Sequence, residues 1–219
     1  MTNFNIKIVS DTVCPWCYVG KKRVDRAIEL YRKAHPAGHD DTFTITWAPF
    51  YLDPTSPAKG VPVVERMAQK FGAERLNMIN QRLSAIGREE GINFAFSGLV
   101  GNTRDSHRLI QLGKTKGNDV ENRVVTELFK SYFEGDGDIT SHATLIAAGE
   151  RAGLVASEVK EWLDSGKGGA EVDEEVQEAY ANGVSGVPNI TIQGTHNFGG
   201  AQEAEVFAAA FAKIKQAST

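Results

Sequence analysis

The residues best suited to chemistry are Cys14 and Cys17, the only two cysteines among 219 residues. Residues three apart on a helix lie about 5–6 Å apart at their β-carbons, which is near the separation that a disulfide bond accepts. A structural disulfide closing so short a loop would add little stability, because that benefit grows with loop length. The spacing therefore predicts a dithiol that interconverts with a disulfide.

The order of the two cysteines predicts different roles for them. We place Cys14 at the first turn of a helix, where free backbone N–H groups and the positive end of the helix dipole favour a thiolate. Cys17 lies one turn further in, and we expect it to be more buried. The thiolate attacks in disulfide exchange, so Cys14 is the predicted nucleophile and Cys17 the resolving partner. Pro15 suits a first helical turn, and Trp16 offers a flat apolar surface to an exposed peptide.

Two alternatives to redox chemistry are a zinc site and an inert structural pair. Zinc sites use three or four protein ligands. The chain has no second cysteine pair, and its histidines stand without ligand spacing at His35, His39, His107, His142 and His196. We therefore expect no metal and no organic cofactor, with the cysteine pair itself as the redox couple. We expect Asp11 to be a capping or loop residue without a catalytic role.

The charge distribution argues against several classes of partner. The formal net charge is −4, with acidic and basic residues interspersed, so no basic stripe indicates binding to nucleic acid or to an anionic membrane. No apolar run approaches the roughly 18 residues needed to cross a bilayer. Residues 1–9 alternate polar and apolar side chains without the cationic start and apolar core of a signal peptide. We expect a cytoplasmic protein.

Both ends of the chain carry strand patterns. Alternating apolar residues predict strands around residues 4–8 and 43–47, and a helical stripe runs between them from Val24 to Ala34, with a stop at Pro36 and Gly38. Two further strands are expected at residues 190–192 and 195–198, before a last helix over 202–215.

The middle of the chain carries helical patterns almost throughout. After a proline-rich bend, helices are expected over residues 103–116, 120–133, 141–152 and 156–165, with one or two more before a glycine-bearing extended stretch at 91–101. The order βαβ, helical block, αββα predicts an α/β domain made of residues 1–62 and 171–219. An all-helical insertion domain of residues 63–170 interrupts it.

Five motifs occur in an order that resembles a known family. They are the segment S-D-T-V-C-P-W-C-Y-V-G-K at residues 10–21, W-A-P-F-Y-L-D-P at 47–54, N-T-R-D-S-H-R-L at 102–109, G-V-S-G-V-P at 183–188 and G-G-A-Q at 199–202. Together they resemble the FrnE-like branch of the DsbA family of thiol–disulfide oxidoreductases. The resemblance implies a thioredoxin fold with a helical insertion and activity in disulfide exchange on protein or peptide substrates.

The resemblance also implies a substrate site. In such proteins a cis-proline loop lies against the cysteine pair, and Pro188 matches that proline. Val187 would then offer backbone groups to an extended substrate strand. Two positions depart from the pattern. Asn189 replaces a more apolar or hydroxyl side chain, and Trp16 stands where the strong oxidases of the family have histidine, so we expect a weaker oxidant. Oxidase, reductase and isomerase directions stay open.

The same broader family includes kappa-class glutathione transferases and 2-hydroxychromene-2-carboxylate isomerases. In that branch the reactive position carries serine, and bound glutathione supplies the sulfur. Cys14 argues against that chemistry here but leaves glutathione open as a co-substrate. Gln202, near the start of the last helix, could help to bind a carboxylate. The alternative functions are a glutathione-dependent transferase or isomerase acting on small electrophiles and a chaperone-like peptide-binding module.

Two further expectations concern the insertion. Asn102 and His107 could lie in a pocket between the insertion and the α/β domain, where a histidine could shuttle protons during exchange. The apolar faces of the insertion could be used internally or could form the interface of a homodimer.

Overall fold

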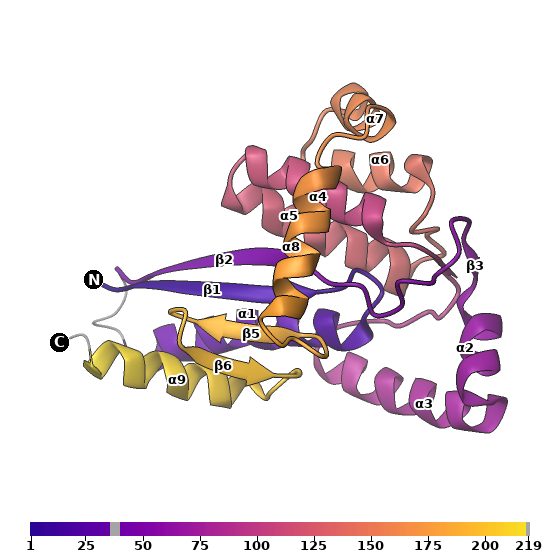
Figure 1. Cartoon of the computed structure of the whole chain (residues 1–219). Coiled ribbons are helices and arrows are strands. Elements are labelled where there is room, and N and C mark those ends of the chain that lie inside the picture. The colour runs from indigo at the N-terminus through magenta and orange to yellow at the C-terminus, as the bar shows by residue number, and fades with distance from the viewer. Residues whose placement is uncertain (36–39, 218–219) are drawn as a thin grey trace.

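A computed structural model describes residues 1–35 and 40–217 of the chain. The helix stop expected at Pro36 and Gly38, and the histidine His39, lie outside the described residues. Strands form near both ends of the chain and helices occupy most of the middle (Figure 1).

The central sheet has four strands in the order β2-β1-β5-β6. Their bounds are Asn3–Ser10 for β1, Thr42–Pro49 for β2, Asn189–Ile192 for β5 and His196–Gly199 for β6. β1 and β2 are parallel, whereas β5 pairs antiparallel with β1 and with β6. The sequence patterns predicted all four strands. In β1 the alternation buries Phe4, Ile6 and Ile8, while Asn5 and Lys7 between them stay exposed.

Two helices from opposite ends of the chain pack against each other beside the sheet. These are α1 (Pro15–Ala34) and α9 (Ala204–Ala217) (Figure 1). Aromatic rings from the sheet and from both helices meet with centroids about 5–6 Å apart, at Phe4, Tyr31, Phe43 and Phe211. α9 begins at Ala204, later than the predicted start at Gln202, so Gln202 lies in the preceding loop.

The helices of the middle segment match the predicted ranges closely. They are α4 (Arg104–Thr115), α5 (Asn118–Phe129) continued by a π-helical turn η2 (Lys130–Glu134), α6 (His142–Arg151) and α7 (Ala156–Asp164). α5 packs against β2 and α4 against α5. α8 (Gly169–Ala181) contacts both β2 and α4, and it stands in front of the sheet in Figure 1. The division into two domains stays a prediction.

The segment after β2 contains an element that the pattern did not predict. The short strands β3 (Val61–Pro62) and β4 (Leu99–Val100) form a separate two-stranded sheet. Between them lie α2 (Val63–Phe71) and α3 (Ala73–Glu89), separated at Gly72, whose φ of 83° suits glycine. The insertion is therefore helical for most of its length but includes β4.

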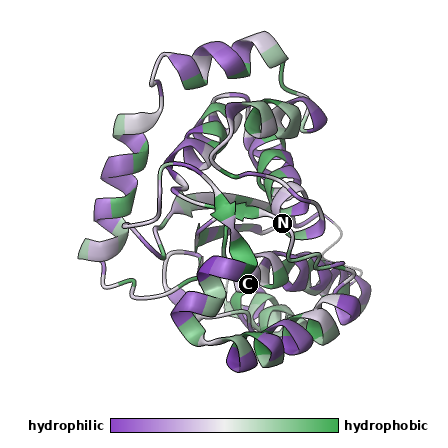
Figure 2. Cartoon of the chain, turned by 90° about the vertical axis from the view of Figure 1, so that its right-hand side faces the viewer, coloured by the Kyte–Doolittle hydropathy of each residue, from purple (hydrophilic) through white to green (hydrophobic). Residues whose placement is uncertain are grey.

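Hydrophobic side chains gather where the elements meet. Figure 2 shows the hydrophobic colour on the strands in the middle of the molecule and both hydrophilic and hydrophobic residues on the surrounding helices. The buried core continues from the sheet through Cys14 and Cys17 into α4 and α5. The cysteine pair therefore lies at the seam between the sheet and the helical segment.

Candidate active site

The start of α1 holds the two cysteines. Cys14 is the N-cap residue, with Pro15 at the first helical position, and the backbone N–H of Cys17 donates to the Cys14 carbonyl at 3.0 Å. The Cys14 N–H donates to the Asp11 carbonyl, also at 3.0 Å. Both side chains are present as free thiols, with exposed fractions of 3% for Cys14 and 0% for Cys17. Cys14 thus lies at the N-terminus of α1, where unpaired backbone N–H groups remain.

The surroundings of Cys17 oppose its ionisation. Complete burial raises the pKa of the Cys17 thiol well above its ordinary value, and the neighbouring Cys14 sulfur raises it further. The Ser10 side chain and the Asp11 backbone act in the opposite direction but do not cancel these effects. At neutral pH Cys17 is therefore a protonated thiol that must lose its proton before it can attack.

The loop before β5 lies directly against Cys14. The Val187–Pro188 peptide bond is cis. The Cys14 thiol is 3.6 Å from the Val187 carbonyl oxygen, to which it can donate. Pro188 is buried against Gly20 of α1, where an added β-carbon would lie 3.1 Å from the proline ring. The structure thus brings together Cys14, Cys17, Val187 and Pro188, which the sequence analysis had assigned to one site.

Side chains from α3 and its C-terminal end hold the active-site helix. Buried Glu90 binds Arg23 at 2.7 Å and Arg26 at 2.8 Å. The half-buried ring of Trp16 has the Arg82 guanidinium 5.7 Å from its centroid, a cation–π distance. α3 therefore borders the surface that Trp16 was predicted to offer to a peptide.

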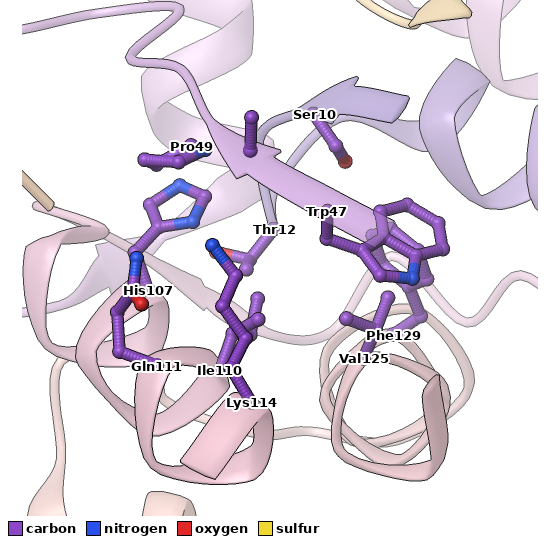
Figure 3. Close-up of a pocket in the computed structure, with 11 residues that line it drawn as sticks. Ser10, Thr12, Trp47, Pro49, His107, Ile110, Gln111, Lys114, Val125 and Phe129 are labelled. Atoms are coloured by element: carbon purple, nitrogen blue, oxygen red, sulfur yellow. The ribbon is translucent and has the colours of Figure 1, made fainter. Parts of the chain in front are cut away.

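A small cavity lies behind the loop that joins β1 to α1. Its volume is about 10 Å³, close to the least that holds one water molecule. Figure 3 shows His107, Ile110, Gln111 and Lys114 of α4 on one side, Val125 and Phe129 of α5 beside them, and Ser10, Thr12, Trp47 and Pro49 opposite. A 2.7 Å hydrogen bond between the hydroxyls of Thr12 and Ser106 ties the loop to α4.

The other predicted site residues do not meet in one pocket. His107 is buried and lines the cavity, as the sequence analysis expected for a pocket between the sheet and the insertion. Asn102 does not line it, and its side-chain oxygen accepts from the Arg104 N–H where α4 begins. Gln202 is exposed and donates to the Gly199 carbonyl. The Asn189 side chain pairs across the sheet with Asn197.

Sequence reasoning missed the contact of Asp11 with His107. Asp11 is 1% exposed, and its Oδ2 accepts from the Leu52 N–H at 2.9 Å. Its Oδ1 lies 3.5 Å from His107 Nε2. Nothing in the local pattern joins two residues so far apart in the chain, although both lie inside motifs that the sequence analysis singled out.

The fold and this site define a thioredoxin-like protein. A four-stranded mixed sheet carries a C-x-x-C pair at the start of a helix, opposite a cis-proline loop. Residues 5–212 match the model of the DSBA-like thioredoxin domain, and the chain belongs to this family of thiol–disulfide oxidoreductases.

The chain is similar to proteins from three organisms. The uncharacterized protein YwbO of Bacillus subtilis (strain 168) is 27% identical over 173 residues, 74% of this chain and 72% of YwbO. The probable DsbA oxidoreductase SCO1869 of Streptomyces coelicolor is 29% identical, with a TM-score of 0.84 over 96% of this chain and 89% of that one. The cytosolic disulfide reductase DsbM of Pseudomonas aeruginosa shares the fold at 13% identity and a TM-score of 0.60, over 97% and 98% of the two chains.

Neither a membrane-spanning helix nor a cluster of metal ligands occurs among the described residues. No helix there is long and apolar enough to span a membrane. In the same residues, no three His, Cys, Asp or Glu side chains group as ligands for a metal ion.

Proposed function

We propose that the chain catalyses dithiol–disulfide exchange on protein or peptide substrates through Cys14 and Cys17. The observation that carries this proposal is the position of Cys14 at the N-cap of α1, with its sulfur 3.6 Å from the carbonyl of the cis-proline loop. Helix N–H groups can stabilise a thiolate there, and a substrate strand can pair with the backbone at Val187.

The reduction of a substrate disulfide proceeds in two exchanges. The Cys14 thiolate attacks one substrate sulfur, forms a mixed disulfide and releases the other sulfur as a thiolate. Cys17 then loses its proton and attacks Cys14, so that the substrate leaves as a dithiol and a Cys14–Cys17 disulfide remains. Substrate oxidation is the same sequence reversed. No group outside the chain is needed for either exchange.

Glutathione is the proposed reductant that returns the pair to the dithiol state. The structure of DsbM with GSH shares this fold at a TM-score of 0.58. Two glutathione thiols would reduce the Cys14–Cys17 disulfide and leave as glutathione disulfide, which balances the two electrons. The same chemistry would let a dithiol substrate be oxidised when glutathione disulfide is in excess.

The experiment is the turnover of a disulfide-bonded peptide with glutathione, compared among wild type, Cys14→Ser and Cys17→Ser. We expect Cys14→Ser to lose turnover entirely. Cys17→Ser should attack once and accumulate a mixed disulfide that mass spectrometry detects. Full turnover by Cys14→Ser would contradict the proposal.

The same variants separate the two alternative functions. If Cys14→Ser conjugated or isomerised small electrophiles with glutathione, the transferase or isomerase alternative would hold. If no variant exchanged disulfides but all bound unfolded peptide equally, the chaperone-like alternative would hold.

A further inference from the structure

The buried Asp11–His107 contact leaves two polar atoms without hydrogen bonds. Among the residues that the structure describes, Asp11 Oδ1 and His107 Nε2 are two of four buried side-chain atoms lacking a partner. Both side chains are at most 3% exposed, and the two atoms lie 3.5 Å apart, longer than an ordinary hydrogen bond. Burying such groups unpaired is costly, so the arrangement calls for an explanation beyond packing.

A proton on the imidazole would satisfy both atoms at once. The other carboxylate oxygen of Asp11 is already held by the Leu52 N–H, so Oδ1 stays directed to His107. With His107 protonated, Nε2 would donate to Oδ1 in a charge-assisted hydrogen bond, which is shorter and stronger than a neutral one. The Asp11 carboxylate is therefore placed to orient the ring through Nε2–H and to stabilise the imidazolium that would form if Nδ1 took up a proton.

The cavity connects this pair to the resolving cysteine. Ser10 interacts with the Cys17 thiol through its side chain and also lines the cavity. His107 lines the same cavity from α4 (Figure 3). The cavity has room for about one water molecule, and hydroxyls and the imidazole supply hydrogen-bonding partners for it. A water molecule in this cavity would complete a path of polar groups from Cys17 through Ser10 to His107.

We propose that His107 and Asp11 receive the proton of Cys17 through Ser10 and a water molecule in this cavity, and so set the rate of the resolving step. This inference rests on the proposed dithiol–disulfide exchange. In the step, the Cys17 proton passes to His107, the Cys17 thiolate bonds to Cys14, and the Cys14–substrate bond breaks. The substrate leaves as a thiolate that solvent protonates.

Other titratable groups near the ring do not share this task. Tyr51 faces the ring at 6.0 Å, and burial raises the pKa of Tyr51 to about 12. Burial raises the pKa of Tyr132, and the charge of Asp11 raises it further. Lys114, on the helix of His107 itself, is paired with Glu175 at 2.8 Å. The two tyrosines are therefore protonated around neutral pH, and the lysine is held in an ion pair.

The test separates the two chemical steps in one experiment. Reaction of the reduced protein with 5,5′-dithiobis(2-nitrobenzoate) releases one coloured thiolate when Cys14 attacks and a second when Cys17 resolves. In stopped flow we expect His107→Gln to keep the first rate within about twofold and to slow the second about 100-fold, at the lower end of general acid–base effects. Asp11→Asn, whose amide oxygen can still accept from the Leu52 N–H, should also slow only the second step.

The pH profile provides a readout that a structural role would not change. In wild type the second rate should depend only weakly on pH, because His107 takes up the Cys17 proton inside the protein. In His107→Gln it should rise tenfold per pH unit without levelling, because only the Cys17 thiolate fraction then matters. The matched control is His142→Gln, which removes a half-exposed histidine 3.0 Å from Asp105 and should change neither step.

Four outcomes would contradict the relay or the proposed function. A second rate in His107→Gln equal to that of wild type, or equal slowing of both steps, would overturn the relay. A first release that is absent in wild type would instead refute the proposed exchange function itself. A release that stops after one equivalent in wild type would show that Cys17 does not resolve, and it would overturn both.

Discussion

Cys14 and Cys17 are three residues apart, yet the backbone gives them unequal environments. Cys14 caps the helix and faces the Val187 carbonyl, whereas Cys17 has no exposed surface and a raised pKa. Because a thiolate reacts far faster than a thiol, this difference assigns attack to one sulfur and resolution to the other.

The first prediction concerns the alkylation of the two thiols. Iodoacetamide at neutral pH should modify Cys14 first and Cys17 at least about 100-fold more slowly, because burial blocks access to Cys17 and holds it protonated. Peptide mapping by mass spectrometry measures both rates, and urea should abolish the difference. Equal rates in the folded protein would contradict the roles assigned here.

The second prediction follows from the direction of the Cys17 pKa shift. Because folding raises this pKa, the protonated thiol contributes stability that is fully present below the unfolded pKa and is lost as pH rises through the folded pKa. Reduced wild type should therefore lose more stability than Cys17→Ala between pH 8 and 10 in urea unfolding. Parallel pH dependence of the two proteins would rule out this linkage.

Among these residues, features set by local spacing could be predicted from the sequence, whereas contacts between residues far apart in the chain could not. The spacing of Cys14 and Cys17 on one helical turn, and the greater burial of Cys17, followed from the helix period. The contact between Asp11 and His107 could not be predicted, because it depends on how α4 docks behind β1. The cis state of the Val187–Pro188 bond likewise depends on tertiary context.

Among the elements, α1 and the cis-proline loop must fit together for the site to form. The fit depends on Gly20, where a β-carbon would approach the Pro188 ring to 3.1 Å and Ala201 to 3.7 Å. A glycine at this helical position allows close approach at some cost in helix propensity. The helix that presents Cys14 therefore also sets the position of the substrate loop.

The third prediction is that Gly20→Val displaces Pro188 from Cys14 and slows exchange about 10-fold or more, because misplacement by about 1 Å can cost that much. Overpacking should also lower stability by about 1–3 kcal/mol. The control is Gly149→Val in α6, where a β-carbon would lie 2.9 Å from Val159. It should lose similar stability and keep its exchange rate. Normal exchange by a folded Gly20→Val protein would disprove the role of this fit.

Most elements followed from periodicity, and the exceptions have physical reasons. The ranges of α4, α6 and α7 agree with the predicted helices within one residue at every end, because long amphipathic patterns are strong signals. β3 and β4 have two residues each, too few for alternation to show. Their pairing depends instead on how the chain folds back through α2 and α3, which lie between the two strands.

For the whole molecule, Asp41 joins both ends of the described chain. Its carboxylate accepts from the Thr2 N–H at 2.6 Å, from Lys215 of α9 at 2.7 Å and from the Tyr31 hydroxyl at 2.8 Å. The start of β1 and the end of α9 lie at the same end of the sheet, on the left of Figure 1. Burial would raise the pKa of Asp41, but these partners hold it at about 2.

The fourth prediction is that Asp41→Asn lowers the free energy of unfolding by about 2 kcal/mol at neutral pH. The pKa of Asp41 is lowered by folding, so its contribution is present above the unfolded value and is lost as pH falls through about 2. Urea unfolding at several pH values should show the difference from wild type shrinking below pH 4. Asp173→Asn, a half-exposed partner of Arg104, should cost less than about 1 kcal/mol. Equal losses in the two variants would be inconsistent with this account.

The class of fold could be predicted from the sequence, but the way its elements pack together could not. Alternating and helical patterns indicated an α/β domain with a helical insertion, and the motif resemblance indicated the family. The strand order β2-β1-β5-β6 and the packing of α8 across β2 and α4 depend on contacts between distant segments, which no local pattern contains.

The proposed function depends on a reversible redox couple formed by Cys14 and Cys17. The most direct test equilibrates the protein in glutathione buffers of graded redox potential, quenches with acid and counts alkylated thiols by mass spectrometry. We expect one reversible two-electron transition between a state with two free thiols and a state with no free thiol, and no such transition in Cys17→Ser. Two alkylated thiols at every potential would contradict the proposed function.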